Sequence, residues 1–126
     1  MNAEKQKVLL IDDEMSILVT FRIALMAAGY DVVTCQSAND GLRLAVKEDF
    51  SFVVVDHRMP DISGAELIKE LREFECRTPV LLMSASDSPI EGELKQTLAP
   101  IRFEAKPLTP SRLRAALSEL DAEAMV

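Results

Sequence analysis

The sequence has few of the residues on which several protein classes depend. It contains one histidine and two cysteines, Cys35 and Cys76, and the two cysteines show no metal-ligand spacing. A reduced, cytoplasmic chain is therefore the simpler interpretation. Basic residues are outnumbered, with 14 against 21 acidic residues, and the net charge is −7. That balance argues against a domain that binds DNA or RNA, where a basic patch is expected.

The sequence also lacks any long apolar run. Its polar first residues lead into only a short apolar run at residues 8–11, which is too short for a signal peptide or a membrane span. Internal repeats, low-complexity stretches, a helix-turn-helix and a kinase core are likewise absent. The 126 residues, of which 48% are hydrophobic and 28% charged, are expected to form one domain over residues 1–126. Residues 121–126 are expected to be a tail or the start of a linker.

What the sequence does contain is an alternation of short apolar runs with amphipathic segments. Apolar runs bounded by polar residues predict strands, and apolar residues that recur every three or four positions predict helices. Strands are expected over residues 8–11, 32–35, 52–56, 79–84 and 101–105. Helices are expected over residues 15–28, from 37 through 46, from 63 through 74, from 89 to 99 and from 109 onward.

This alternation predicts an α/β fold with a five-stranded parallel sheet and helices on both faces. The flavodoxin-like strand order 2-1-3-4-5 is the best-known five-stranded solution, and it brings the ends of the first and third strands together. In such a sheet, ligands bind beyond the carboxyl ends of the strands. The side chains expected at that edge are Asp12 and Asp13 after the first strand, Asp56 at the end of the third, Ser84 at the end of the fourth and Lys106 after the fifth.

These side chains could surround one phosphoryl group. Three crowded carboxylates repel one another and require a cation, and oxygen ligands without His or Cys suit Mg²⁺. A carboxylate such as Asp56 can act as a nucleophile and carry a phosphoryl group as an aspartyl-phosphate. Mg²⁺ would neutralise charge on the phosphoryl oxygens, while the Lys106 ammonium and the Ser84 hydroxyl would bind two further oxygens.

In these respects the sequence resembles the response-regulator receiver domains of two-component signalling. The matching motifs are Asp12-Asp13-Glu14 after the first strand, Asp56 after the third, Met59-Pro60-Asp61 with Gly64, Ser84-Ala85 after the fourth strand and Lys106-Pro107 after the fifth. The resemblance extends over residues 8–120. Each motif alone is a weak signal, but their order and their places at the strand ends are specific.

The resemblance implies how the acidic residues would act. Asp56 would be the phosphoacceptor, and Asp13 with Asp56 would bind Mg²⁺ directly. Asp12 would act mainly through a metal-bound water. The backbone carbonyl of Arg58 would supply another metal ligand.

The remaining implied roles concern the phosphoryl group and the signal. Ser84 and Lys106 would contact the phosphoryl group, Ser84 and Phe103 would act as switch residues, and the Lys106-Pro107 bond would be cis. The donor would be a sensor histidine kinase or a histidine phosphotransfer protein, and an unidentified output protein or domain would receive the signal. The face made by the fourth helix, the fifth strand and the fifth helix would allow a homodimer. No enzymatic activity is expected beyond the chain's own phosphoryl transfer and slow autodephosphorylation.

Two features leave another interpretation open. Phe103 lacks the hydroxyl of a tyrosine and fits a plain core aromatic equally well. The fourth helix contains Pro89 and Gly92 and is followed by Pro100, so we expect it to be short or partly uncoiled. The alternative function is therefore a receiver-like interaction module that works without phosphorylation.

Two further interpretations are disfavoured. A hydrolase with an aspartate nucleophile would place that residue after the first strand in an Asp-x-Asp motif, whereas Asp56 follows the third strand and Arg58 stands two positions later. The single histidine, His57, adjoins Asp56 in the chain, where its side chain should point elsewhere. We expect it to be structural or on the surface rather than catalytic.

Overall fold

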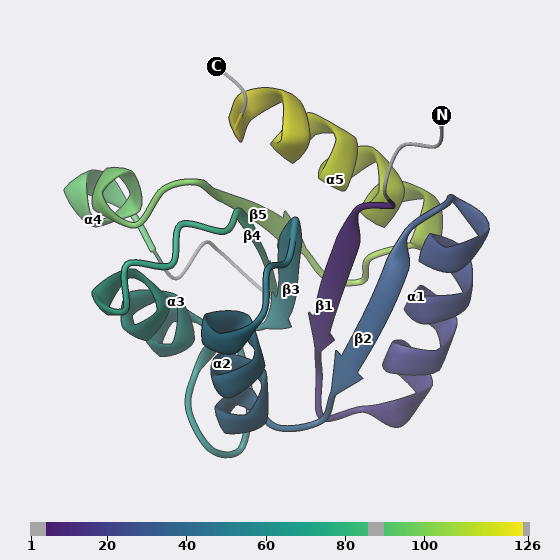
Figure 1. Cartoon of the computed structure of the whole chain (residues 1–126), viewed down its shortest axis with the longest axis horizontal. Helices are drawn as coiled ribbons and strands as arrows, with labels where there is room; N and C mark the ends of the chain where they lie inside the picture. Colours follow the sequence, from purple (N-terminus) through teal and green to yellow (C-terminus); the bar gives the residue numbers. More distant parts are fainter. Residues whose placement is uncertain (1–4, 86–89, 125–126) are drawn as a thin grey trace.

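The computed structural model of this chain describes residues 5–85 and 90–124, and in these ranges five strands alternate with five helices (Figure 1). The strands are β1 (Lys7–Ile11), β2 (Asp31–Cys35), β3 (Phe52–Asp56), β4 (Val80–Ser84) and β5 (Ile101–Ala105). The helices are α1 (Met15–Ala27), α2 (Ala38–Lys47), α3 (Gly64–Glu73), α4 (Gly92–Thr97) and α5 (Pro110–Ala124). The expected alternation is confirmed.

The strands form one parallel sheet in the order β2-β1-β3-β4-β5, which confirms the flavodoxin-like topology. The register aligns the strand ends. Ile11 pairs with Val55, and Ser84 pairs with Ala105. The residues at the ends of β1, β3, β4 and β5 therefore emerge at the same edge of the sheet.

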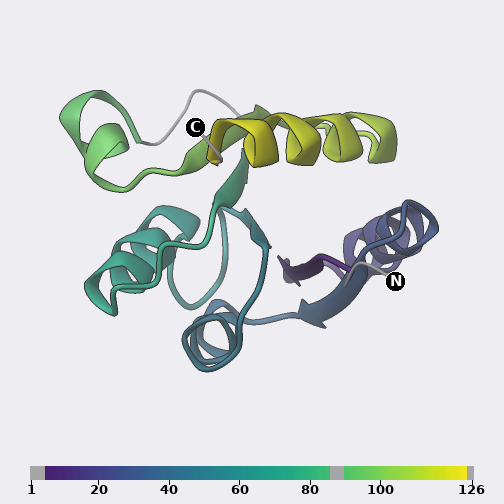
Figure 2. The same cartoon turned by 45° about the horizontal axis from the view of Figure 1, so that its top comes forward.

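Helices cover both faces of the sheet (Figures 1 and 2). Side chains alternate between the two faces along a strand, so Val8 and Leu10 of β1 pack with α1 and α5. Leu9 and Ile11 pack with α2 and α3 on the other face. β3 and β4 are buried along their whole lengths, which explains why their sequences are unbroken apolar runs. Over the described residues, no helix combines the length and the apolar character needed to cross a membrane.

The helix ends follow the capping signals in the sequence. The side-chain oxygens of Ser37, Ser63 and Thr109 each accept a hydrogen bond from the backbone N–H three residues later, at 3.0–3.1 Å. Gly29 lies just beyond α1 with φ at 100°, a conformation that favours glycine. These local signals therefore position helices α1, α2, α3 and α5 as expected.

The three-to-four-residue periodicity of the sequence predicts several side chains on buried helix faces that are exposed in the structure. Phe74 is 61% exposed because it is the C-cap residue of α3, beyond the part of the helix that the sheet covers. Val46 in the last turn of α2 is 43% exposed. Ala28 and Ala124, at or just beyond the ends of their helices, are exposed too, as is Leu94 of α4. Periodicity shows which residues share a helix face, but it does not show where the sheet beneath that face ends.

The helix α4 is short, as expected, but it begins later than residue 89. It has six residues, and none of them is buried. Gly92 is its first residue, with φ at 65°, and is not a weak point in its interior. Ile90 and Leu98, on either side of the helix, are buried in the core. The expected start at Pro89 lies outside the described residues.

Candidate functional site

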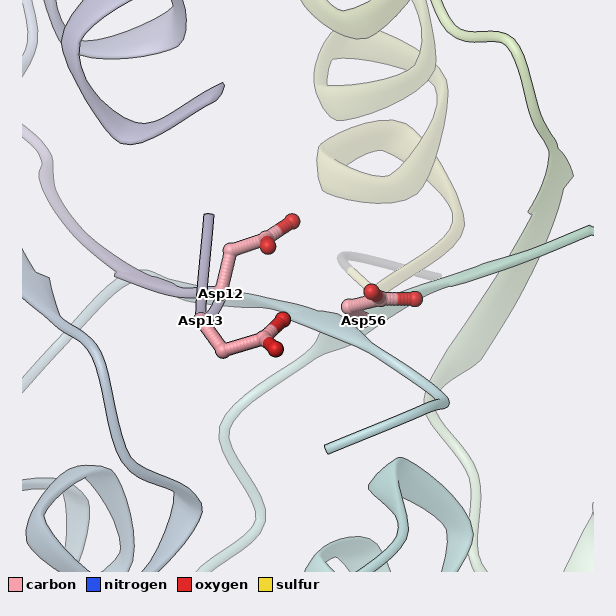
Figure 3. Close-up of side chains that lie close together, drawn as sticks. All are labelled: Asp12, Asp13 and Asp56. Atoms are coloured by element: carbon pink, nitrogen blue, oxygen red, sulfur yellow. The ribbon is translucent and has the colours of Figure 1, made fainter. Parts of the chain in front are cut away.

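Three aspartates meet at the carboxyl edge of the sheet (Figure 3). Asp56 is the last residue of β3, and Asp12 and Asp13 follow β1. One carboxylate oxygen from each residue lies within 4.8 Å of the other two. Asp12 and Asp56 are 1% and 4% exposed, whereas Asp13 is open to solvent. The pairing of β1 with β3 thus concentrates three negative groups in a largely buried place.

Asp12 is incompletely satisfied in this cluster. Its Oδ1 accepts a hydrogen bond from the Glu14 backbone N–H at 2.9 Å, but its Oδ2 is buried and has no hydrogen-bond partner among the described residues. Burial raises the pKa of Asp12 to about 6, the hydrogen bond from Glu14 opposes that rise, and the charge of Asp56 adds to it. A bound cation would give Asp12 Oδ2 a partner and would reduce the repulsion between Asp12 and Asp56.

Lys106 supplies a positive charge to the same cluster. Its Nζ donates a hydrogen bond to Asp56 Oδ2 at 2.9 Å. Burial alone would lower the pKa of Lys106, but the hydrogen bond to Asp56 and the nearby carboxylate charges raise it. The backbone N–H of Lys106 donates to the Ser84 carbonyl oxygen at 2.8 Å, which fixes the residue at the end of β5. The ammonium group therefore stays charged beside Asp56 at neutral pH.

The other expected site residues lie at different distances from this cluster. Ser84 is buried at the end of β4, on the same sheet edge. The Arg58 backbone N–H points at Asp56 Oδ1 at 3.4 Å, while its side chain is exposed. Phe103 is half-buried in the middle of β5, opposite Leu82 of β4 and away from the edge. The structure thus groups Asp12, Asp13, Asp56 and Lys106, and the roles of Ser84, Arg58 and Phe103 stay predictions.

The loop after Asp56 is held closely against the sheet. The His57 N–H donates to the Met83 carbonyl, and the His57 carbonyl accepts from the Gly64 N–H, both at 2.8 Å. A Cβ atom on Gly64 would lie 2.9 Å from the Asp56 carbonyl oxygen and 2.6 Å from Leu82 Cδ1. Glycine therefore lets the start of α3 approach the backbone of the site, and half-buried His57 contributes through its backbone.

Asp61 has a structural function that its place in the sequence did not suggest. Its carboxylate accepts hydrogen bonds from the backbone N–H groups of Ala38 and Asn39, at 3.3 and 2.9 Å, in the first turn of α2. Burial alone would raise the pKa of Asp61, but hydrogen bonds from backbone N–H groups lower it. The loop of the site is thereby attached to the N-terminus of α2, where a negative charge is favourable. The Pro60-Asp61 pair indicates a turn, but nothing local identifies a partner 22 residues away.

Comparisons with known proteins agree with this geometry. The family model described as the response regulator receiver domain matches residues 8–118. The chain is similar to the alkaline phosphatase synthesis transcriptional regulatory protein PhoP of Bacillus subtilis, with 31% identity over 110 residues that cover 87% of this chain and 46% of that protein. It is also 30% identical over 120 residues to the uncharacterized transcriptional regulatory protein YkoG of the same species, covering 92% of this chain and 53% of that protein. The chain spans about half the length of these two relatives.

Solved structures show the same architecture at nearly full length. The chemotaxis response regulator CheY4 of Vibrio cholerae has a TM-score of 0.82 and 28% identity, over 93% of this chain and 99% of that one. The receiver domain of the Francisella response regulator 1452 has a TM-score of 0.83 and 26% identity, over 95% of this chain and 99% of that one. With the strand order, the aspartate cluster and the family match in agreement, this chain belongs to the family of response regulator receiver domains.

Proposed function

We propose that this chain is a phosphorelay receiver that accepts a phosphoryl group on Asp56 from a phosphohistidine, in a reaction that requires Mg²⁺. The observation that carries the proposal is the surroundings of Asp56. This carboxylate ends a fully buried strand, one of its oxygens lies 2.9 Å from the Lys106 ammonium, and two further aspartates lie within 4.8 Å. A solvated carboxylate at a strand end would need neither the burial nor these neighbours.

In the proposed step, an oxygen of the Asp56 carboxylate attacks the phosphorus atom. The bond between phosphorus and the histidine ring of the donor breaks. This ring, which is protonated on its other nitrogen, leaves as a neutral imidazole. Lys106 donates a hydrogen bond to one carboxylate oxygen of Asp56, and its ammonium group would bind a phosphoryl oxygen as negative charge develops. Ser84, at the end of the neighbouring strand β4, would donate a hydrogen bond to another phosphoryl oxygen.

The residues present fit a magnesium site. Asp13 and Asp56 would bind the ion directly, Asp12 would act mainly through a water, and the Arg58 carbonyl would supply a further oxygen. All of these ligand atoms are oxygens, which Mg²⁺ prefers. Asp12 Oδ2, which has no hydrogen-bond partner in the described part of the chain, would be stabilised by a nearby positive charge. When bound, the ion supplies positive charge that neutralises phosphoryl oxygens.

The same proposal includes partners and output. A sensor histidine kinase or a histidine phosphotransfer protein would supply the phosphoryl group, and the phosphorylated conformation would dock on an output protein or domain. Ser84 and Phe103 would carry the switch between the two conformations. The chain would act in the cytoplasm and would catalyse only its own phosphoryl transfer and slow autodephosphorylation. The transcriptional regulators that it resembles are about twice as long, so an output unit outside this chain is part of the proposal.

The alternative function is an interaction module that works without phosphorylation. It differs from the proposed receiver in one measurable property, the uptake of a phosphoryl group. Purified protein is incubated with a small phosphodonor, with Mg²⁺ or with EDTA, and the intact protein is weighed. We expect the wild type to gain the mass of one phosphoryl group only with Mg²⁺, and the Asp56→Asn variant to gain none. Asp31→Asn, at the start of β2 on the opposite edge of the sheet, is the matched control and should behave as the wild type. An unmodified wild type would favour the alternative, and equal labelling of the Asp56→Asn variant would refute the assignment.

A further inference from the structure

We propose that the surface formed by α2 and α3 is a dimer interface between two copies of this chain. These helices lie side by side on the sheet face opposite α1 and α5 (Figures 1 and 2). Between them is an apolar groove of about 340 Å³, lined by Leu42, Arg43, Val46, Lys47 and Phe74. We call this the α2–α3 surface. The proposal does not depend on phosphorylation of Asp56.

The apolar part of the α2–α3 surface is exposed and firmly positioned. Phe74 is 61% exposed and Val46 is 43% exposed. The turn after Phe74 is fixed, since Glu75 adopts a φ of 62° and the Cys76 N–H donates to the Leu71 carbonyl at 2.9 Å. A well-placed exposed aromatic ring beside an apolar groove is typical of surfaces that a protein partner covers.

Near the C-terminal ends of the two helices, beside Phe74 and Val46, stand charged side chains of opposite sign. Lys47 stands on α2, whereas Glu70 and Glu73 stand on α3, one turn and one residue before Phe74. Among the described residues, none of these three side chains forms an ion pair within the chain. The α2 side of the groove therefore offers an unpaired positive charge, and the α3 side offers unpaired negative charges.

This arrangement complements itself. A twofold axis parallel to the two helices places α2 of one protomer over α3 of its partner. Phe74 of each protomer then packs on Val46 and the groove of the other, and Lys47 of each faces the acidic side of the other. A partner with charges of one sign would be attracted to only one side of the groove. A second copy of this chain offers an acidic side to Lys47 and a basic side to Glu70 and Glu73.

The resemblance to receiver domains suggests the face of α4, β5 and α5 for a homodimer. That face differs from the α2–α3 surface in its ion pairs. On β5 and α5, five of its charged side chains are paired within the chain. Ion pairs at 2.8–3.3 Å join Arg102, Glu104, Arg112, Glu119 and Glu123. A partner on the β5 and α5 part of that face would compete with ion pairs that already exist, whereas Lys47, Glu70 and Glu73 of the α2–α3 surface have none among the described residues.

Sedimentation equilibrium of the unphosphorylated protein tests the proposal. We expect the wild type to show a monomer–dimer equilibrium, and Lys47→Glu or Glu70→Lys to weaken association about tenfold or more. The double variant Lys47→Glu/Glu70→Lys should recover the wild-type dissociation constant to within about threefold, because the charges are exchanged rather than lost. Phe74→Ser should weaken association without unfolding the chain, since the ring is mostly exposed. Lys95→Glu, an exposed charge reversal on α4, is the matched control and should change nothing.

Three results would overturn the proposal. The first is a wild type that stays monomeric at its highest soluble concentration. The second is a double variant that does not recover the association lost in its two single variants. The third is association that Lys95→Glu weakens and Lys47→Glu leaves intact, which would assign the dimer to the face of α4, β5 and α5. Circular dichroism of each variant shows that a loss of association is not a loss of folding.

Discussion

Asp12 is the residue of the site in which burial and charge conflict most directly. Its pKa is about 6 in the folded chain and 3.8 in the absence of the fold, chiefly because of burial. At pH values between these two pKa values, the folded state binds more protons than the unfolded state does. The metal-free protein therefore loses stability as the pH rises from about 4 to about 6, and the full cost persists at higher pH.

Replacing Asp12 with Asn should remove this cost. The Asn side chain keeps an oxygen that accepts from the Glu14 N–H and stays neutral at every pH. In EDTA at about pH 7.5, we expect Asp12→Asn to raise the free energy of unfolding by about 1–3 kcal/mol, with the gain vanishing near pH 4. Urea denaturation at both pH values measures it. A gain of the same size at both would show that the charge of Asp12 is not its origin.

Replacing Asp13 tests the metal site without disturbing a buried group. It is exposed, and its carboxylate is one of the three that would surround the ion. Asp13→Ala should lower the affinity for Mg²⁺ by about tenfold or more, because a charged oxygen ligand is lost. Without metal the variant should be no less stable than the wild type, because one of three repelling charges is gone. Calorimetric titration with Mg²⁺ checks this, and the exposed Asp31→Ala serves as the control. Equal affinities of the two variants would contradict a metal site at Asp13.

At the scale of elements, one buried arginine joins the end of α3 to the end of α4. Arg72 is buried, and its guanidinium donates to the carbonyl oxygens of Cys76 and Thr78, at 2.8 and 2.9 Å, and of Leu98 and Pro100, at 2.8 and 3.1 Å. Burial lowers the pKa of Arg72 to about 10. Four carbonyl dipoles compensate for burying the cation. The short helix α4 is thereby attached to the rest of the domain by a polar contact as well as an apolar one.

Arg72→Met should detach that end of α4. The change leaves four carbonyl groups without this donor, so we expect a loss of about 2–4 kcal/mol in the free energy of unfolding. Amide hydrogen exchange over residues 92–98 should accelerate more than exchange in the sheet. Arg22→Met, an exposed arginine on α1, is the control and should change neither quantity. Uniform acceleration over the whole chain would show that Arg72 supports global stability and has no special relation to α4.

The elements themselves could be predicted because their signals are local. β1, β3 and β4 each contain a continuous run of four apolar residues, and Ser37, Ser63 and Thr109 cap their helices as the sequence indicates. Periodicity misplaces Phe74 at the end of α3, because it does not show where a neighbouring layer stops. Arg72 occupies a position that an apolar residue could fill, and two of its partners, the carbonyl groups of Leu98 and Pro100, lie 26 and 28 residues away. Such a contact depends on the assembled fold and carries no sequence signal.

At the scale of the whole molecule, the site and the proposed dimer surface are separate but connected. The aspartate cluster lies at one edge of the sheet, whereas the α2–α3 surface lies on one face (Figure 1). Asp61 links them, since it belongs to the loop after β3 and caps the first turn of α2. The cluster of Asp12, Asp13, Asp56 and Lys106 could be predicted because topology alone brings these strand ends together. The link through Asp61 and the exposure of Phe74 could not, because both depend on how helices pack.

We propose that Asp56, and neither Asp12 nor Asp13, carries the phosphoryl group. An acyl phosphate can be reduced by borohydride, which converts the modified aspartate into homoserine and leaves free carboxylates unchanged. The wild type is treated with a small phosphodonor and Mg²⁺, reduced, digested and mapped by mass spectrometry. We expect homoserine at position 56 alone, and none in a sample that received EDTA in place of Mg²⁺. Homoserine at position 12 or 13, or equal amounts with and without Mg²⁺, would contradict it.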